Sequence, residues 1–540
     1  MGKKATVTVH PSYSIGDISP RLFGAFLEPI GSMVNGSMYN PKHPMADDKG
    51  FRRDFIDALK GTGLPAVRLP GGNFVSGWDW KDSIGPLAQR KAHLDLAWQQ
   101  YIPNDVGHDE YLQWAQRVGC EPLYTINLGT GDISDAIHIV EYTNHPGGTH
   151  WSDLRRTYGQ DKPYGVRTWY LGNEMDGPWQ IASWEKNPRG YGVLAHEASK
   201  AMKWVDPSIE TVACVSSSPF LSTYPQWDIE VLQECYETVD YISLHHYHTA
   251  PQGDIGALLG GSAMFEDYIR TEIALCDFVQ AKLRTSKPMM LSFDEFGSFF
   301  DRRRELHHGR GGRVNGSFFY KFDANGAYVR HDPDDWSTRR SFDHGSEMLG
   351  ALASASVFLT LMRHADRVKI GCMTAGLGAL AATDREHVWR SCAYHPLTQL
   401  IRYGRGVSLL TSVDCDTYNI PGYALSDFHQ YDTHEGVPFI ESAAAYDAAS
   451  GELNVFVINR NWEEDTAFEL DASGFHDARF MEHLQLYSDD LDVRSSYENP
   501  DPIVPTVNAA ATFERGKVCC TVKKLSWNAF RFQVARPEIP

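Results

Sequence analysis

Two glutamates stand at the ends of apolar, aromatic-rich segments, in a setting that suits acid–base chemistry. Glu174 lies at the centre of WYLGNEMDGPW, and Glu295 lies near the end of PMMLSFDEFG. Each segment has the pattern of a strand that ends on the carboxylate, because glycine and other turn residues follow closely. Two carboxylates facing each other can cleave a glycosidic bond, one as general acid and the other as nucleophile or base. Either residue alone could instead be a helix-cap, turn or salt-bridge residue.

More than a hundred residues separate these two glutamates, so the fold must bring distant strands side by side. Eight apolar runs of strand length occur in the first 381 residues and alternate with helical patterns. This alternation predicts a (β/α)8 TIM barrel over residues 18–405, with the chemistry at the rim where all the strands end. The predicted strands are 22–28, 66–71, 122–129, 166–174, 211–218, 241–247, 288–295 and 367–376.

The pattern changes after about residue 405. Short strands with turn residues between them replace the alternation of strands and helices. They predict a C-terminal β-sandwich, jelly-roll-like, over residues 406–540. The first 17 residues have the same alternation, so we expect them to contribute a strand to that sandwich. The chain is therefore predicted to have two domains, with an insertion at 301–340 in the barrel.

Polar side chains at the other predicted strand ends are of the kind that holds a sugar. They are Glu28, Arg68, Asn73, Asn173, His245 and Tyr247. Amides and carboxylates offer sugar hydroxyls hydrogen-bond partners in fixed directions. We expect Arg68 and Tyr247 to hydrogen-bond Glu295 and keep it ionised. His246 and His248, in the same run as His245, are expected to be structural.

Composition narrows the class of partner. The formal net charge of the 540 residues is −19, which argues against nucleic acid or an anionic membrane and favours a neutral substrate. The nine cysteines show no metal-ligand spacing. We expect no metal and no organic cofactor. The chain starts without an apolar leader and has no membrane-length apolar run, so a cytoplasmic location is expected.

The insertion 301–340 differs from the rest of the chain. It is basic within an acidic protein, shows no clear secondary structure and directly follows the segment of Glu295. Long irregular loops in compact domains are usually functional or disordered. Two interpretations remain open, an active-site lid or subunit contact on the one hand and a solvated insertion on the other.

Several long strings resemble glycoside hydrolase family 51, the intracellular α-L-arabinofuranosidases of clan A. They include ISPRLFGAFLEPIG, RLPGGNFVSGWDW, GNEMDGPWQ, SLHHY and SFDEFG, and the resemblance extends along nearly the whole chain. It implies a barrel with a C-terminal sandwich, Glu174 as general acid/base and Glu295 as nucleophile of a retaining double displacement. It also implies that Glu28, Asn73 and Asn173 bind furanose hydroxyls, that Tyr247 lies at the subsite, and that Trp98 lines the cleft. Homo-oligomers, often hexamers, are a further expectation from the family.

The chain departs from the family pattern around the sugar. Pro29 follows Glu28 where the family usually has histidine, and the nucleophile is followed by FGSFF in place of WNVW. An ungapped alignment puts Ala375 and Gly378 where the family has glutamine and asparagine, which predicts a roomier wall with fewer polar contacts.

The function that we predict is retaining exo-hydrolysis of terminal, non-reducing α-L-arabinofuranosyl residues from oligosaccharides. A β-D-galactofuranosidase, or an enzyme with both specificities, is the alternative. A non-catalytic sugar-binding protein on the same scaffold is a weaker alternative, because both glutamates are present.

Overall fold

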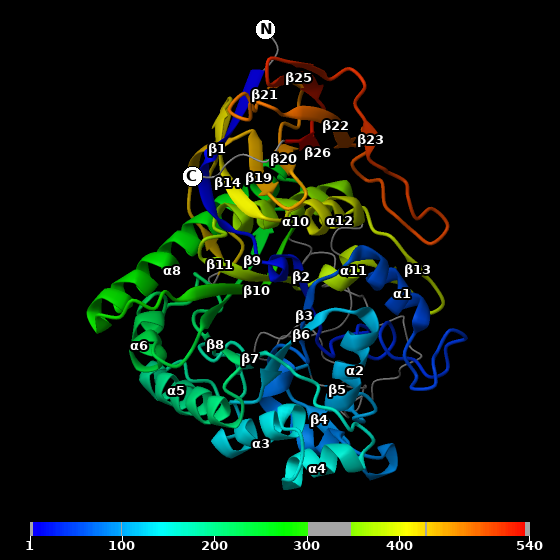
Figure 1. Ribbon diagram of the computed structural model, residues 1–540, viewed down its shortest axis with the longest axis vertical. Helices are drawn as coiled ribbons and strands as arrows, with labels where there is room; N and C mark the ends of the chain where they lie inside the picture. Colours follow the sequence, from blue (N-terminus) through cyan, green and yellow to red (C-terminus); the bar gives the residue numbers. More distant parts are fainter. Residues whose placement is uncertain (1–3, 99, 301–346, 427–428, 535–540) are drawn as a thin grey trace.

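Eight parallel strands close into a barrel in the computed structural model, which describes residues 4–98, 100–300, 347–426 and 429–534. Each strand pairs with the next one along the chain, and the last strand, β11, closes on the first, β2 (Figure 1). The barrel strands are β2 (Gly24–Phe26), β3 (Ala66–Leu69), β6 (Glu121–Ile126), β7 (Thr168–Leu171), β8 (Glu210–Cys214), β9 (Tyr241–Ala250), β10 (Met290–Phe300) and β11 (Val368–Met373). The predicted TIM barrel is confirmed, and all eight strands fall within or across the predicted ranges.

Helices surround the barrel and pack on it through their apolar residues. In α1, for example, Phe55, Ile56 and Leu59 are buried, and the helix ends at Gly63, whose φ of 76° only glycine adopts without strain. The helices are α1 (Arg53–Thr62), α2 (His108–Val118), α3 (Ile133–Asn144), α4 (His150–Thr157), α5 (Pro188–Val205), α6 (Gln226–Cys235), α7 (Ile255–Gly260), α8 (Ser262–Leu283), α10 (Met348–Arg363), α11 (Gly376–Leu380) and α12 (Tyr394–Tyr403). Four 3-10 turns, η1 (Pro20–Phe23), η2 (Asn73–Gly77), η3 (Trp80–Ser83) and η4 (Leu87–Gln89), lie in the first barrel units.

A ten-stranded sheet forms the second domain. Its strand order is β23-β22-β26-β20-β19-β14-β1-β21-β25-β24. The strands are β1 (Lys4–Asp17), β14 (Val407–Asp414), β19 (Ile440–Asp447), β20 (Glu452–Asn459), β21 (Thr466–Asp471), β22 (Arg479–Leu486), β23 (Thr506–Val507), β24 (Thr512–Glu514), β25 (Lys517–Val522) and β26 (Ser526–Gln533). The N-terminal strand β1 runs antiparallel to β14 and parallel to β21. We propose 1–17, 18–405 and 406–540 as the domain limits on this basis.

The ten-stranded sheet folds back on itself. Phe468 of β21 and Phe530 of β26 stack with ring centroids 5.3 Å apart, although four strands separate β21 from β26 in the sheet order. Phe480 of β22 and Phe513 of β24, near opposite ends of that order, also approach to 5.9 Å. The sheet therefore encloses its own apolar core between two layers, as the predicted β-sandwich requires. Short two-stranded sheets complete the fold: β4 (His93–Asp95) with β5 (Gln100–Ile102), β12 (Ala382–Thr383) with β13 (Val388–Trp389), β15 (Thr417–Ile420) with β18 (His434–Pro438), and β16 (Tyr423–Ala424) with β17 (Gln430–Tyr431).

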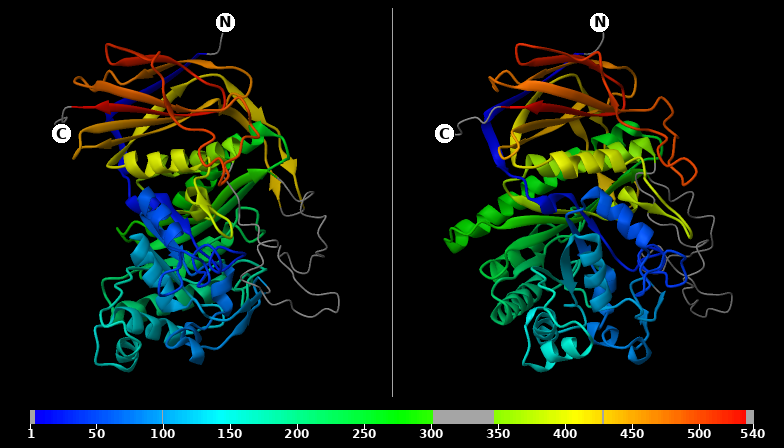
Figure 2. Two further views of the ribbon diagram at one scale, coloured as in Figure 1. Left: turned by 90° about the vertical axis from the view of Figure 1, so that its right-hand side faces the viewer. Right: turned by 45° about the vertical axis from the view of Figure 1, so that its right-hand side comes forward.

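Helix α10 lies between the barrel and the sandwich. Every residue from Ala351 to Met362 is buried, because one side of the helix packs on the barrel and the other on the sheet (Figure 2). Arg363 at its end pairs with Glu441 of β19 at 3.0 Å. The two domains therefore share a packed interface.

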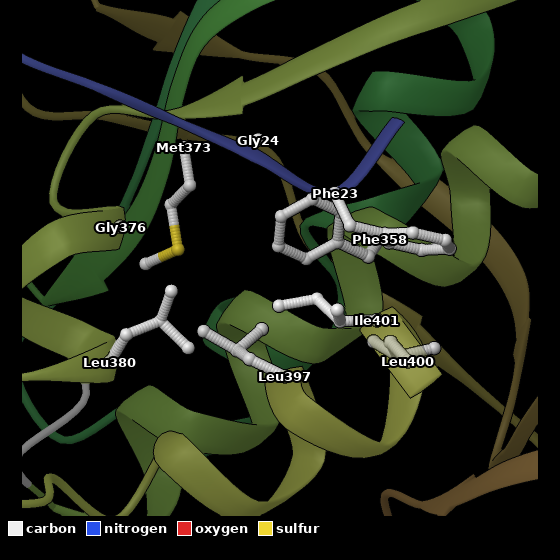
Figure 3. Close-up of a pocket in the computed structure, with 9 residues that line it drawn as sticks. All are labelled: Phe23, Gly24, Phe358, Met373, Gly376, Leu380, Leu397, Leu400 and Ile401. Carbon is white, nitrogen blue, oxygen red and sulfur yellow. The ribbon is translucent and has the colours of Figure 1, made fainter. Parts of the chain in front are cut away.

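A small apolar cavity remains where β2, α10, α11 and α12 meet (Figure 3). Its volume is about 10 Å³, which is near the lower limit for one water molecule. Its lining side chains, among them Phe23, Phe358 and Met373, offer no hydrogen-bond partner. It is a packing defect and not a ligand site.

Two further points concern the sequence predictions. The basic insertion 301–340 lies outside the described residues, so its two interpretations stay open. Among the helices that the structure describes, none has both the length and the apolar character needed to cross a membrane.

Candidate active site

The bottom of the site is a plug of side chains inside the barrel. Phe26, Leu123 and Tyr170 are among the residues packed there. Arg68, on β3, lies against Phe26 and Tyr170, with its guanidinium carbon 5.2 and 4.9 Å from their ring centroids. Arg68 is fully buried. A buried guanidinium of this kind requires carboxylate partners, and it finds them at the barrel rim.

Glu295, on β10, is held by two donors. Arg68 Nη1 lies 2.6 Å from Glu295 Oε1, and the Tyr247 hydroxyl donates to Oε2 over 2.7 Å. Tyr247 also lies 2.8 Å from the Thr374 hydroxyl, at the end of β11. The expected contacts of Arg68 and Tyr247 with Glu295 are both present. They fix both carboxylate oxygens, so the carboxylate is held in one orientation.

A β-bulge turns two successive carboxylates of β10 into the barrel. The pairing of β10 with β9 shifts register between Phe293 and Glu295, so Asp294 is an extra residue in the strand. Successive side chains of a regular strand point to opposite faces. Here Asp294 and Glu295 both contact Arg68, at 2.9 and 2.6 Å. The bulge therefore doubles the negative charge that faces the arginine.

Glu174 follows β7 in a backbone conformation that is unusual for glutamate. Its φ is 46°, in the left-handed region that residues with a Cβ atom rarely adopt. The carboxylate is bound on both oxygens, by His245 Nδ1 at 3.0 Å on Oε1 and by the Trp179 indole N–H at 2.6 Å on Oε2. Such strain persists only where the surroundings impose it, and it is common at active sites.

The two glutamates approach each other across the rim. One oxygen of Glu174 and one oxygen of Glu295 lie within 4.8 Å of each other and of a His245 nitrogen. Retaining glycosidases hold their carboxyl groups about 5–5.5 Å apart, whereas inverting enzymes need about 6.5–9.5 Å to admit a water. An oxygen pair this close fits the spacing of a double displacement better than the spacing of an inverting enzyme.

Asparagines beside the carboxylates form a fixed polar wall. Asn173 Oδ1 accepts from Arg68 Nη2 at 2.7 Å, and Asn173 Nδ2 donates to Asn73 Oδ1 at 2.9 Å. Gln180 Nε2 donates to the same Asn73 oxygen at 2.9 Å and to the Asn173 carbonyl at 2.6 Å. Because each amide is oriented by a neighbour, the wall presents directed groups without rearrangement.

Glu28 lies on the other side of the site and is almost fully buried. Its Oε1 accepts from the Phe74 backbone N–H at 2.9 Å and from the Trp98 indole at 2.8 Å. The carboxylate also lies against Gly72, where a side chain would collide with it. Glycine at this position therefore permits the close approach of Glu28.

Burial and neighbouring charges shift the pKa values of three groups. Burial, aided by the charge of Glu295, raises the pKa of Glu28 to about 8. Burial lowers the pKa of His245, but the carboxylates of Glu295, Asp294 and Glu174 outweigh it and raise the pKa to about 10. Burial raises the pKa of Glu295, and the charge of Glu174 adds to this, against the lowering effect of His245, Arg68 and Tyr247.

The cluster of Glu174, His245 and Glu295 has the spacing of a possible cation site. Its chemistry does not favour one. An imidazole whose pKa is near 10 carries a proton on both nitrogens at neutral pH and offers no lone pair to a metal. Arg68 already supplies the positive charge that Glu295 requires. We therefore keep the expectation that no metal takes part.

All the predicted site residues lie in this one region of the barrel rim, which their contacts connect. The structure adds four residues that the sequence reasoning did not single out: Trp179, Gln180, Asp294 and Thr374. Three of them lie inside strings already quoted, WYLGNEMDGPWQ and SFDEFG. His246 is fully buried, with its ring 4.7 Å from that of Phe265, as its structural interpretation expected.

The two positions of the predicted wall differ in burial. Ala375 is 3% exposed and belongs to the main apolar core, at the start of α11, whereas Gly378 is partly exposed. The roomier wall therefore stays a prediction.

A barrel whose rim carries a close pair of oriented carboxylates is the architecture of a glycoside hydrolase. Two family models match the chain: "Alpha-L-arabinofuranosidase 1 domain" over residues 58–267 and "Alpha-L-arabinofuranosidase C-terminal domain" over residues 327–526. An intracellular exo-α-(1→5)-L-arabinofuranosidase of Acetivibrio thermocellus is 37% identical over 534 residues, which is 98% of this chain and 99% of that protein. An exo-α-(1→6)-L-arabinofuranosidase of Bifidobacterium longum is 30% identical over 98% of this chain and 97% of its own.

Solved structures agree with these relatives. A family 51 α-L-arabinofuranosidase from Bifidobacterium longum superimposes with a TM-score of 0.85 at 27% identity, covering 98% of this chain and 100% of its own. The arabinose complex of the Thermotoga maritima enzyme gives a TM-score of 0.81 at 26% identity, covering 98% and 99%. The chain belongs to the family 51 α-L-arabinofuranosidases.

Proposed function

We propose that the protein is a retaining exo-α-L-arabinofuranosidase that removes terminal non-reducing arabinofuranosyl residues from oligosaccharides. The observation that carries the proposal is the separation of Glu174 and Glu295, whose oxygens lie within 4.8 Å. The names of the relatives, exo-α-(1→5)- and exo-α-(1→6)-L-arabinofuranosidases, support the sugar and the exo mode of action.

The contacts of each glutamate suggest its role. Glu295 has both oxygens aligned by Arg68 and Tyr247, and attacks the anomeric carbon to form a glycosyl-enzyme. Glu174 protonates the departing oxygen and then removes a proton from the water that releases the sugar. His245 and Trp179 orient Glu174 in both steps.

Polar groups on both sides of the two glutamates hold the furanose ring. Asn73, Asn173 and Glu28 provide directed partners for hydroxyl groups. Trp98, which donates to Glu28, provides an aromatic edge to the cleft. No metal or organic cofactor takes part in this scheme.

Location and assembly are further parts of the proposal. Relatives from three genera named intracellular support action in the cytoplasm on imported fragments. We propose a homo-oligomer, with a hexamer as the expectation from the family. Light scattering after size exclusion would give the mass, and a monomer at micromolar concentration would contradict this part.

Activity is tested on a panel of p-nitrophenyl glycosides with the purified protein. We expect hydrolysis of the α-L-arabinofuranoside with retention of anomeric configuration, followed by NMR in the first minutes. Preferred cleavage of the β-D-galactofuranoside would instead support the alternative specificity. A parallel preparation of Glu295→Ala shows whether any activity comes from a host glycosidase.

A further inference from the structure

Asp294 contacts both of the cationic groups that hold the catalytic pair. It is fully buried. Its Oδ2 lies 2.9 Å from Arg68 Nε and 3.3 Å from His245 Nε2, and it accepts from the Ser243 hydroxyl at 3.0 Å. No water or sugar reaches it, so it is not placed to react with substrate.

Each of these two cationic side chains also binds one catalytic carboxylate. The other face of Arg68 binds Glu295 at 2.6 Å, and the other nitrogen of His245 binds Glu174 at 3.0 Å. Asp294 is therefore linked to the nucleophile through Arg68 and to the acid/base through His245. Removing the Asp294 carboxylate would leave two buried donors, Arg68 Nε and His245 Nε2, without their charged partner.

A β-bulge in β10 brings Asp294 and Glu295 to the same side of the strand. Ser292, two residues before Asp294, hydrogen-bonds Tyr170 in the barrel interior, so regular alternation carries Asp294 to the inner face. The bulge then re-aims Glu295, which would otherwise point away from Arg68. Both carboxylates therefore contact Arg68 from adjacent positions of one strand.

We propose that Asp294 is a positioning residue that holds Glu295 and Glu174 in register through Arg68 and His245. The proposal rests on the proposed function, because it assigns the pair their catalytic roles. In this role Asp294 contacts neither the substrate nor the reacting atoms and acts only through Arg68 and His245.

The charges that face His245 come from three elements. Asp294 and Glu295 lie on β10, Glu174 lies after β7, and Arg68 of β3 binds the two carboxylates of β10. Asp294→Asn keeps the shape of the side chain and removes one negative charge from this set. His245, which stays buried, should then lose its second proton at a lower pH.

The experiment compares Asp294→Asn with the wild type and two controls. We expect kcat to fall about 10- to 100-fold, the usual range for an outer partner of a catalytic group, with KM changed much less. NMR of nitrogen-15-labelled histidine should show His245 titrating well below the wild-type value near 10. His245→Gln assigns the resonance by its loss.

The controls separate positioning from packing. Ser243→Ala removes the hydrogen bond to Asp294 and a 3.3 Å contact with His245 Nε2, but it removes no charge, so His245 should keep its high pKa. Asp228→Asn removes another fully buried carboxylate, which binds Ser216 away from the site, and should leave kcat unchanged. A fall in kcat of equal size in Asp228→Asn would show that the loss is general destabilisation.

Two results would overturn the proposal. One is a folded Asp294→Asn with wild-type kcat and an unshifted His245. The other needs only the wild-type protein: a His245 that carries a single proton at neutral pH could not donate to Asp294 and Glu174 together. The NMR titration uses no substrate, so its result does not depend on the proposed function. A failure of the proposed function would instead appear as inactivity of the wild type on every arabinofuranoside.

Discussion

The indole of Trp179 donates a hydrogen bond to Oε2 of Glu174 over 2.6 Å, in a loop where Glu174 itself adopts a φ of 46°. Trp179 is 36% exposed, so its ring borders the solvent side of the site while its N–H points inward. Together with His245 on Oε1, it fixes the plane of the carboxylate that we propose first gives and then takes a proton.

Trp179→Phe is expected to lower kcat modestly. Phenylalanine keeps the aromatic surface but not the N–H, and a partly exposed hydrogen bond contributes about 0.5–1.5 kcal/mol, or roughly 2- to 10-fold in rate. The loss should be larger on substrates with poor leaving groups, which need protonation most. Trp204→Phe, at a tryptophan that is 78% exposed on α5, is the matched control and should behave as wild type. An equal loss for good and poor leaving groups would show that Trp179 does not assist the proton transfer.

Alanine variants of the two glutamates should fail in different ways. Glu174→Ala is expected to lose about 10²- to 10⁴-fold on poor leaving groups, less on activated aryl glycosides, and to regain its second step when azide is added. Glu295→Ala should lose activity on all of them, because no glycosyl-enzyme forms. Steady-state kinetics against leaving-group pKa distinguishes the two. Identical leaving-group dependence in both variants would contradict the assigned roles.

Strand periodicity accounts for much of what could be predicted. Alternate residues of β9 face inward, so Ser243, His245 and Tyr247 reach the site while His246 packs outward against Phe265. The contacts of Arg68 and Tyr247 with Glu295 follow from their positions at strand ends that converge on one rim.

The bulge and the loops could not be predicted in the same way. A strictly alternating strand puts Asp294 on the opposite face from Glu295, and nothing in SFDEFG marks the extra residue. Trp179 and Gln180 lie in an irregular segment, in which Gln180 is held by Asn73 of η2 and by the Asn173 carbonyl after β7. The burial of Ala375 in the apolar core could not be predicted either, because it depends on packing between elements that are distant in the sequence.

Removal of divalent metals should leave activity unchanged. The positive charge beside the carboxylates comes from Arg68 and from a doubly protonated His245, whose pKa is near 10, so no ligand atom of the imidazole is free for a metal at neutral pH. Prolonged treatment with EDTA, followed by assay and by elemental analysis, checks this. Activity that is lost with EDTA and restored by one metal would mean that the cluster of Glu174, His245 and Glu295 is a cation site after all.

The stability of the protein should fall as Glu28 ionises. The pKa of Glu28 is raised from 4.5 to about 8 in the folded state, so the folded protein binds its proton more tightly than the unfolded chain does. The corresponding stabilisation is complete below about pH 4.5 and is lost as the pH rises through about 8. Glu28→Gln is neutral at every pH, and its Oε1 can still accept from Phe74 and Trp98, which both bind Oε1 in the wild type. The Tm of Glu28→Gln relative to wild type should therefore rise across this range, whereas Glu28→Ala, which removes the acceptor, should be less stable than Glu28→Gln throughout. If the Tm difference between Glu28→Gln and wild type stayed constant from pH 4.5 to pH 8, the carboxyl would not be held neutral in the folded protein.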